Sequence, residues 1–474
     1  MSFDLPIPNG WRLVKLSDLG EVNRGKSRHR PRDAGHLYGG KYPFVQTGDV
    51  KASGGRISVF TQTYSEDGLT QSRLWPKGTM CITIAANIAE TGILQFPACF
   101  PDSVIGFIAD ESKCNVHFIE YVFRLLRKRI QAQATGSVQD NINLQTLERL
   151  MFPIPELSEQ NRIAEVLCSL DDKIALNTQT NQTLEAIAQA VFKSWFVDFE
   201  PVKAKMAVLE AGGTAEEAER AAMCAISGKD EAALTQLQTE QPDAYVELAQ
   251  TAALFPSTMQ DSELGEIPEG WDVVSLSDLI QITGGGTPKR SEPNYWNGDI
   301  PWFSVKDVPA DGNVFVVDTE EKITHEGLKK SSTKLLKRGT TIITARGTVG
   351  KLALLAGDMC MNQSCYGING KGTGPYFNYF NLRQAVSTLL RNTHGAVFDT
   401  ITTRTFDTYR TSFGGSEIAN RFDAVVMPIL EKVESNIREN MVLTHIRDAL
   451  LPKLLSGELT LPPAEKTPSE ADCD

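Results

Sequence analysis

The chain has 474 residues, with apolar and charged fractions of 41% and 22% and a formal net charge of -12. This length predicts two or three domains with enough material for packed cores. We find no run of about 18 apolar residues and no basic-then-apolar leader at residues 1–10, so neither a membrane span nor a signal peptide is expected. The eight cysteines form no C-x-x-C pair and the six histidines are scattered. This pattern argues against zinc and disulfide frameworks and favours a cytoplasmic location.

The negative charge is concentrated in two segments of the chain. Residues 200–266 carry 13 acidic and 4 basic residues, and residues 458–474 carry 5 acidic residues and 1 basic residue. The rest of the chain is slightly positive, so the net acidity does not exclude contact with phosphate. We interpret the first segment as a partly helical connector that spans distance or docks on a basic partner surface. The second segment has the composition of a disordered tail.

The chain contains an internal duplication. Residues 7–27 read IPNGWRLVKLSDLGEVNRGKS and residues 267–287 read IPEGWDVVSLSDLIQITGGGT, with ten identical positions. Further matches keep nearly the same spacing, namely YPFVQTGDV at 42–50 with IPWFSVKDV at 300–308, and KGTMCITIA at 77–85 with RGTTIITAR at 338–346. The chain is therefore two tandem copies of a mixed domain, each followed by a long helix.

Within each domain the local patterns indicate strands and one longer helix. Short β-branched runs such as Thr340–Thr344 are bounded by glycine, proline and aspartate, which is typical of strands joined by turns. Helices are expected at 116–134 in the first copy and 376–391 in the second. We therefore predict α+β domains rather than a regular βαβ fold.

The two long helices are predicted at 157–199 and 416–457. In each, apolar side chains recur at steps of three and four and so form a stripe along one side of the helix. A long core helix of a large domain would show the same periodicity. The stripe residues are Leu167, Leu170, Ile174, Leu184, Ala188, Val191 and Trp195 in the first helix, and Val426, Ile429, Val433, Leu443, Leu450 and Leu454 in the second, where Arg447 occupies one further stripe position.

Each stripe is interrupted near its middle by two asparagines. Asn177 and Asn181 lie 259 positions before Asn436 and Asn440, which is the offset of the whole helix repeat. Buried amides are costly unless they pair, and paired amides fix the register of a coiled coil. Either orientation of pairing would bring these residues together. We predict an antiparallel coiled coil.

Catalytic motifs are not evident. We find neither a G-x-x-x-x-G-K-[ST] phosphate loop nor an Asn-Pro-Pro-aromatic stretch of the kind found in adenine methyltransferases. Asp318, Glu320 and Lys322 superficially resemble a nuclease set, but such triplets are common by chance in polar stretches. The sequence therefore does not predict an enzyme.

A basic loop follows the first strand of each copy. It contains alternating cations in RGKSRHRPR at 24–32, and it reads GGGTPKRSEPNYW at 284–296 in the second copy. Basic side chains on a glycine-rich loop can approach a phosphate backbone, and arginine can read guanine with two hydrogen bonds. A solvated loop is the alternative. The predicted DNA contacts are Lys26, Ser27, Arg28, Arg30, Thr287, Lys289 and Arg290 in the loops, and Gln46, Asp49, Ser304, Lys306 and Arg346 elsewhere in the two domains.

An ordered set of stretches carries a family resemblance. In the second copy these are GGGTPKR (284–290), DIPWFSVKDV (299–308), RGTTIITARGTVGKLALL (338–355) and MNQSCYG (361–367). In the first copy they are GSVQDNIN (136–143), FPIPELSEQNRIAEVL (152–167) and AVFKSWFVDF (190–199). The chain thereby resembles the specificity subunits of type I restriction–modification systems. It departs from them at RGKSRHRPR, which replaces the glycine-threonine-proline loop, and at SFGGSEIANRF, which lacks a proline-rich lead.

The resemblance implies a non-catalytic, DNA-binding subunit without a cofactor of its own. Each variable domain would recognise one half of a bipartite site on double-stranded DNA. The paired helices would act as a spacer and dock two modification subunits, which methylate adenine with S-adenosylmethionine. Restriction subunits with motor and nuclease activities, and hence a need for ATP and Mg, would join for cleavage. A self-contained restriction enzyme and a protein-binding scaffold are the competing interpretations.

The expected architecture combines these predictions. It is an α+β chain with two tandem target recognition domains, each followed by a long helix, and the two helices pair as an antiparallel coiled coil. The expected segments are a first recognition domain at 1–156, a spacer helix at 157–199, an acidic connector at 200–266, a second recognition domain at 267–415, a second spacer helix at 416–457 and a disordered tail at 458–474.

Overall fold

The computed structural model divides into two compact units. The first unit comprises residues 1–174 and 442–474, and the second comprises residues 175–441. Each unit contains one mixed domain and parts of both long helices. The structure describes residues 7–29, 31–85, 87–135, 144–310, 313–392 and 400–461.

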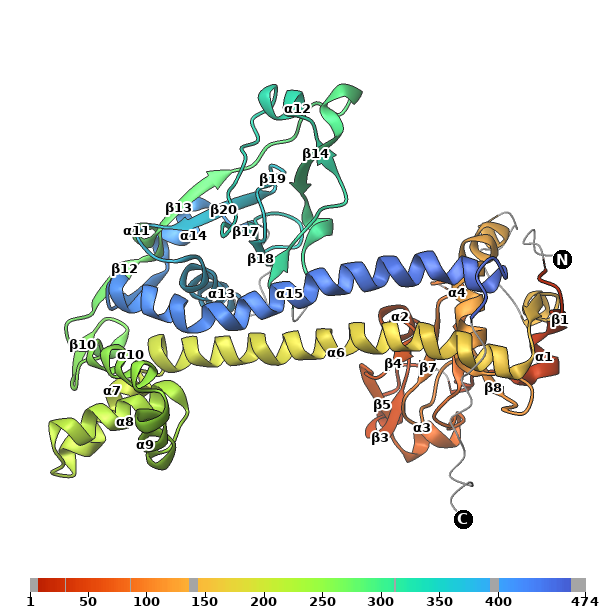
Figure 1. Cartoon of the computed structure of the whole chain (residues 1–474), viewed down its shortest axis with the longest axis horizontal. Coiled ribbons are helices and arrows are strands. Elements are labelled where there is room, and N and C mark those ends of the chain that lie inside the picture. The colour runs from red at the N-terminus through yellow and green to blue at the C-terminus, as the bar shows by residue number, and fades with distance from the viewer. Residues whose placement is uncertain are drawn as a thin grey trace, which may run out of the picture. The chain divides into compact units, whose positions relative to one another are not determined.

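The two long helices, α6 (Leu157–Phe196) and α15 (Ser416–Leu455), each have 40 residues and run side by side (Figure 1). In the second unit, the Asn177 side-chain amide donates to Asn440 Oδ1 at 2.9 Å. The Asn436 amide donates to Asn181 Oδ1 at 2.8 Å in the same unit. Residue numbers therefore increase along α6 in the direction in which they decrease along α15, which defines an antiparallel pair. The predicted antiparallel pairing and its asparagine register are confirmed.

Replacing Asn436 by leucine is expected to lower the free energy of unfolding by about 1–3 kcal/mol, because the buried Asn181 carbonyl loses its donor. Chemical denaturation followed by circular dichroism measures the change. The double variant Asn181→Leu/Asn436→Leu removes both amides and should recover part of the loss. A single variant as stable as the parent chain would contradict a stabilising role for this pair.

The first domain is built around a mixed, largely antiparallel five-stranded sheet of order β2-β8-β6-β7-β4. Helix α4 packs on it through Phe118 and Val122, and the same core reaches Ile163 and Leu167 of α6. The side chain of Asn115 starts α4 by accepting hydrogen bonds from the next turn. The strands are β1 Arg12–Lys15, β2 Gly20–Arg24, β3 Tyr38–Phe44, β4 Arg56–Ile57, β5 Gln62–Tyr64, β6 Met80–Thr83, β7 Thr91–Leu94, β8 Val104–Ala109 and β9 Met151–Ile154. The helices are α1 Leu16–Leu19, α2 Thr47–Ala52, α3 Glu66–Thr70, α4 Val116–Thr135 and α5 Leu144–Glu148, with η1 at Gly35–Leu37.

The second domain repeats this plan, with a five-stranded sheet of order β13-β20-β17-β18-β15. Its helix α13 packs against α15, and Asp423 of α15 accepts hydrogen bonds from the α13 backbone at Tyr376 and Phe377. Burial raises the pKa of Asp423 to about 6. The strands are β12 Asp272–Ser275, β13 Ile280–Gly284, β14 Trp296–Phe303, β15 Phe315–Val316, β16 Lys322–Ile323, β17 Thr341–Thr344, β18 Leu352–Leu355, β19 Cys360–Met361, β20 Cys365–Gly370 and β21 Arg410–Phe413. The helices are α11 Leu276–Leu279, α12 His325–Lys329, α13 Pro375–Asn392 and α14 Thr403–Thr408, with η2 at Pro293–Tyr295 and η3 at Val305–Asp307.

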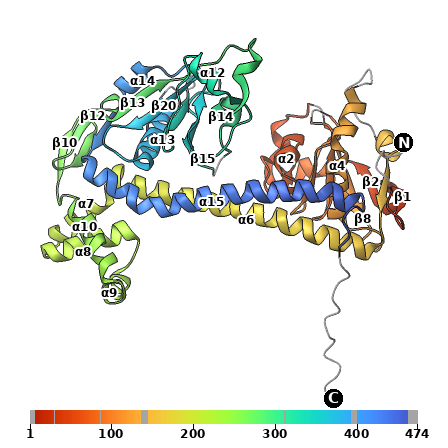
Figure 2. The ribbon, with the colours of Figure 1, turned by 45° about the horizontal axis from the view of Figure 1, so that its top comes forward.

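The acidic segment between the copies is a packed helical bundle (Figure 2) rather than an extended linker. Lys205 is 3% exposed and donates to Glu219 at 2.7 Å and to the carbonyls of Ala252 and Phe255 at 2.8 and 2.7 Å. Phe255 also meets Trp195 of α6 edge to face. The segment therefore belongs to the core of the second unit. Its elements are α7 Glu200–Glu210, α8 Ala215–Ser227, α9 Glu231–Glu240, α10 Pro242–Ala253, β10 Met259–Ser262 and β11 Gly265–Pro268.

Among the described residues, no helix combines the length and apolar character needed to cross a membrane. The predicted tail is described only as far as Leu461, and residues 462–474 lie outside the described part.

Candidate nucleic-acid interface

Three strand ends of the second domain meet at one edge of its five-stranded sheet. β13 and β17 both end against the start of β20, with Gly284 opposite Tyr366 and Thr344 opposite Cys365. The loops that follow β13 and β17 and the loop that precedes β20 therefore leave the sheet at the same edge. Arg346 lies in the loop after β17.

The glycine-rich loop after β13 is held by its backbone. Gly286 N donates to Met361 O at 3.0 Å, and the indole of Trp302 donates to Gly286 O at 3.0 Å. A second indole, that of Trp296, donates to Lys289 O at 3.3 Å. The course of the loop is thus set by main-chain contacts, which leaves most of its side chains free to vary.

Arg290 is the cation of this loop that packs against aromatic rings. Its guanidinium lies 3.9 Å from the ring centroid of Trp296 and 5.1 Å from that of Trp302. Its Nη2 atom donates to Glu321 Oε2 at 3.0 Å, and hydrogen bonding to Arg290 lowers the pKa of Glu321. The Arg290 side chain remains 55% exposed. The arginine is therefore preorganised, and it can reach an anion only by leaving or sharing its glutamate.

The remaining predicted contacts of the second domain lie around this loop or beside its edge of the sheet. The side chains of Lys289 and Lys306 are 72% and 66% exposed and form ion pairs with nearby glutamates. Such exposed pairs are weak and exchange readily for phosphate. Arg346 is exposed as well, whereas Thr287 is half-buried and its hydroxyl donates to Gln363.

The basic loop of the first domain is also held by backbone hydrogen bonds. Gly25 N donates to Val104 O at 2.8 Å, and Lys26 N donates to Phe100 O at 3.1 Å. The side chains of Lys26 and Arg28 are exposed. Arg30 lies outside the described residues. The two copies thus present cations from equivalent edges of equivalent sheets.

Four predicted contacts are engaged within the protein. Ser27 is 7% exposed, with its hydroxyl 3.4 Å from that of Tyr64. Asp49 is 9% exposed and accepts the Gln46 backbone N–H at 2.8 Å, which caps α2. Ser304 takes the corresponding place at the start of η3, where its backbone N–H donates to Asp307 Oδ2 at 2.8 Å and its hydroxyl accepts the Lys306 N–H at 3.3 Å. The Gln46 side chain donates to Gln62 at 2.6 Å. These residues shape the loops, and the exposed cations remain the better candidates for direct contact.

A second group of exposed cations was not predicted from the sequence. Lys329, Lys330 and Lys334 are exposed beside a loop that packs on Gly286, where an added Cβ would lie 2.3 Å from Ser332 Oγ. The run KKSSTK was the available signal, but the first copy has a single cation at the corresponding place, Arg73, which forms an ion pair with Glu21. Only the fold shows that it adjoins the glycine-rich loop.

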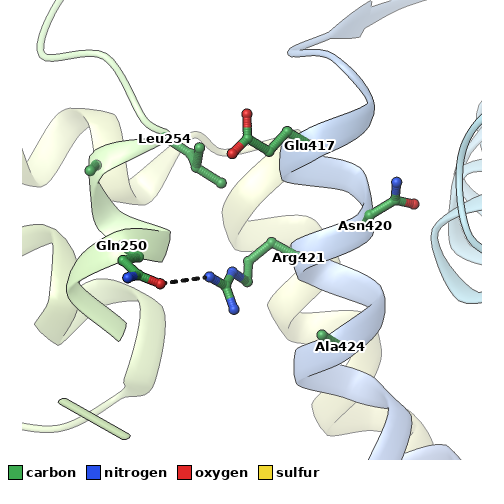
Figure 3. Close-up of a pocket in the computed structure, with 7 residues that line it drawn as sticks. Gln250, Leu254, Glu417, Asn420, Arg421 and Ala424 are labelled. Carbon is green, nitrogen blue, oxygen red and sulfur yellow. Dashed lines mark hydrogen bonds between the residues drawn. The ribbon is translucent and has the colours of Figure 1, made fainter. Parts of the chain in front are cut away.

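A pocket of about 510 Å³ lies elsewhere in the second unit, between α10 and α15 (Figure 3). Its main polar contact joins Arg421 to Gln250 at 3.3 Å. None of the predicted DNA contacts lines it, and its lining residues offer no nucleophile paired with a base. Within the described ranges, no group of His, Cys, Asp and Glu side chains could hold a metal ion.

Comparison with known proteins gives a consistent result. The family model for the type I restriction modification DNA specificity domain matches residues 8–186 and 268–418, one segment in each copy. The chain is 36% identical over 369 residues to the type I restriction enzyme HindI specificity subunit of Haemophilus influenzae, covering 74% of this chain and 80% of that protein.

Two further matches span nearly the whole chain. The MjaIX specificity subunit of Methanocaldococcus jannaschii is 25% identical over 477 residues, covering 96% of this chain and 94% of that protein. A crystal structure of a type I restriction–modification S subunit from M. genitalium shares the fold, with a TM-score of 0.53 at 14% identity. The match covers 96% of this chain and 99% of that one.

Proposed function

Because this chain belongs to the family of type I restriction–modification DNA specificity domains, we propose that each of its recognition domains reads one half of a bipartite DNA site. The carrying observation is the duplicated sheet whose equivalent edges both present exposed cations on backbone-held loops. A duplicated reader suits a site with two separated halves.

The chain is the non-catalytic specificity subunit and assembles with DNA and with other subunits of a type I system. We propose two modification subunits docked on the paired helices, with restriction subunits joining for cleavage. S-adenosylmethionine, ATP and Mg would then be bound by those partners, and the complex would act in the cytoplasm. Neither a self-contained restriction enzyme nor a protein-binding scaffold gains support from the relatives.

The exposed cations divide into two proposed roles. Lysines such as Lys26, Lys289 and Lys306 are compact charges suited to phosphate, and these contacts position the protein without reading bases. Arg28 and Arg290 have planar forks that can pair with the major-groove edge of guanine. The Arg290 guanidinium already lies 3.9 and 5.1 Å from the centroids of two indole rings, and this packing reduces the entropy lost on binding.

Exchange of residues 1–156 for the corresponding domain of another specificity subunit is expected to change one half of the recognised sequence and leave the other half unchanged. Each domain folds around its own core, so its loops should read DNA independently. Sequencing of methylated adenines in cells that express the chimera with its modification partner measures the outcome. Change in both halves, or in neither, would contradict the division of the site. Binding that does not weaken with salt would favour the scaffold instead.

A further inference from the structure

Each recognition domain carries an arginine on its long helix at an equivalent position. Arg124 lies on α4 and Arg383 lies on α13, and they are separated by 259 residues, the offset of the duplicated helices. Both bond a carboxylate of α6, Asp171 for Arg124 and Glu185 for Arg383. Apolar residues surround each contact, so the arginines lie where domain and helix pack together.

The contacts of Arg124 reach three elements of the first unit. Its Nη1 donates to Asp171 Oδ2 of α6 at 3.0 Å, its Nε donates to Glu120 on α4 at 2.7 Å, and its Nη2 donates to Gly54 O before β4 at 2.9 Å. The side chain is only 13% exposed. Three donors of one rigid fork are therefore committed to three directions.

Asp171 completes the junction by joining the domain to both helices. It accepts the Tyr121 hydroxyl at 2.8 Å and Nη1 of Arg447, on α15, at 2.7 Å. Its side chain is 8% exposed. Burial alone would raise the pKa of Asp171, but Arg124 and Arg447 outweigh it and hold the pKa below its ordinary value. The carboxylate is thus charged at neutral pH.

The second domain is tied to both helices as well. Arg383 forms its ion pair with Glu185 of α6, whose side chain is 11% exposed. Arg338, just before β17, forms a two-bond pair with Glu434 of α15 at 2.8 and 2.7 Å. Glu434 has a side chain that is 8% exposed.

Directional contacts of this kind can fix an angle that apolar packing leaves loose. Apolar burial is non-directional, whereas a guanidinium fork bonds carboxylates in a narrow range of geometries. On DNA, one added base pair between half-sites shifts the far half by about 3.4 Å along the axis and turns it by roughly 35°. A domain held at a fixed angle on its helices should therefore reject a spacer that is one base pair too long or short.

We infer that Arg124 and Arg383 are positioning residues, which hold each domain at a fixed angle on the helices and thereby restrict the spacer length that the subunit accepts. The inference rests on the proposed bipartite recognition. It assigns spacer selectivity to specific ion pairs, in addition to the helices themselves.

The test compares Arg124→Gln with Arg127→Gln in the full complex with modification subunits. Arg127 lies on the same helix and pairs at 2.8 Å with Glu90, inside the domain, so it is a matched control. Binding is measured at fixed salt on duplexes with the native spacer and with one base pair more or fewer. The parent complex and Arg127→Gln should prefer the native spacer at least tenfold. Arg124→Gln should reduce that preference severalfold, with unchanged affinity for a duplex carrying a single half-site.

A charge exchange in the second unit distinguishes loss of the ion pair from loss of folding. Arg383→Glu should lose spacer preference, and the double variant Arg383→Glu/Glu185→Arg should regain it. Unchanged spacer preference in folded Arg124→Gln and Arg383→Glu would overturn the inference while leaving the proposed function intact. A parent complex insensitive to either half-site sequence would instead overturn the proposed function.

Discussion

Alanine in place of Lys26, Arg28, Lys289 and Arg290 is expected to weaken binding of the assembled complex to its DNA site by at least about a hundredfold. All four side chains are exposed on loops at equivalent edges of the two sheets. Each lost phosphate contact should also lower the slope of log affinity against log salt by roughly 0.9. A salt series of gel shifts measures both quantities.

Two exposed cations at the opposite ends of the same sheets provide the control. Lys113 lies after the C-terminal end of β8 and pairs with Asp110 at 3.0 Å. Lys337 lies before the N-terminal end of β17 and pairs with Asp358 at 2.6 Å. Alanine at both positions removes two of the four positive charges that the loop variant removes, but should leave DNA affinity within about twofold. An equal loss of binding free energy per charge removed in the two variants would mean that only the overall charge matters, and the loops would then be ordinary solvated surface.

Replacing Gly285 by alanine should weaken DNA binding at least tenfold through the second half-site alone. An added Cβ would lie 1.9 Å from Asn362 O and 2.9 Å from Met361 O, so the loop must move away from β19. That movement would break the bond from Gly286 N to Met361 O and displace the carbonyl that accepts from the Trp302 indole.

The neighbouring glycine makes a close comparison. A Cβ at Gly284 would meet nothing within 4 Å, so Gly284→Ala should bind like the parent protein. Competition binding with duplexes in which one or the other half-site is scrambled shows which half-site is no longer recognised. Tight binding by Gly285→Ala would show that the loop conformation is unimportant for recognition.

Most of what could be predicted about the fold came from the internal duplication of the sequence. Ten identities near the start of each copy and the recurring asparagines were enough to predict paired domains and antiparallel helices, because register is set by a few polar positions in an apolar stripe. The predicted helices at 116–134 and 376–391 correspond to α4 and α13 within one residue at each end.

The site was less predictable because its polar residues look alike in sequence. Asp49 and Ser304 lie in matching stretches of the two copies, yet each takes part in a local helix cap. Arg290 was predicted as a contact, but its pairing with Glu321 joins residues 31 positions apart and depends on the sheet. The connector also packs through Lys205, a charged residue whose burial no hydropathy pattern indicates.

The two basic loops are held by main-chain hydrogen bonds, and this has a consequence for evolution. Gly25 and Gly286 hold their loops through backbone N–H groups, which every residue except proline possesses. Substitutions at the exposed positions between such bonds can alter the bases chosen while the sheet and its core stay intact. New DNA preferences can therefore arise by single steps through folded intermediates, and a host lineage could diversify its recognition without rebuilding the scaffold.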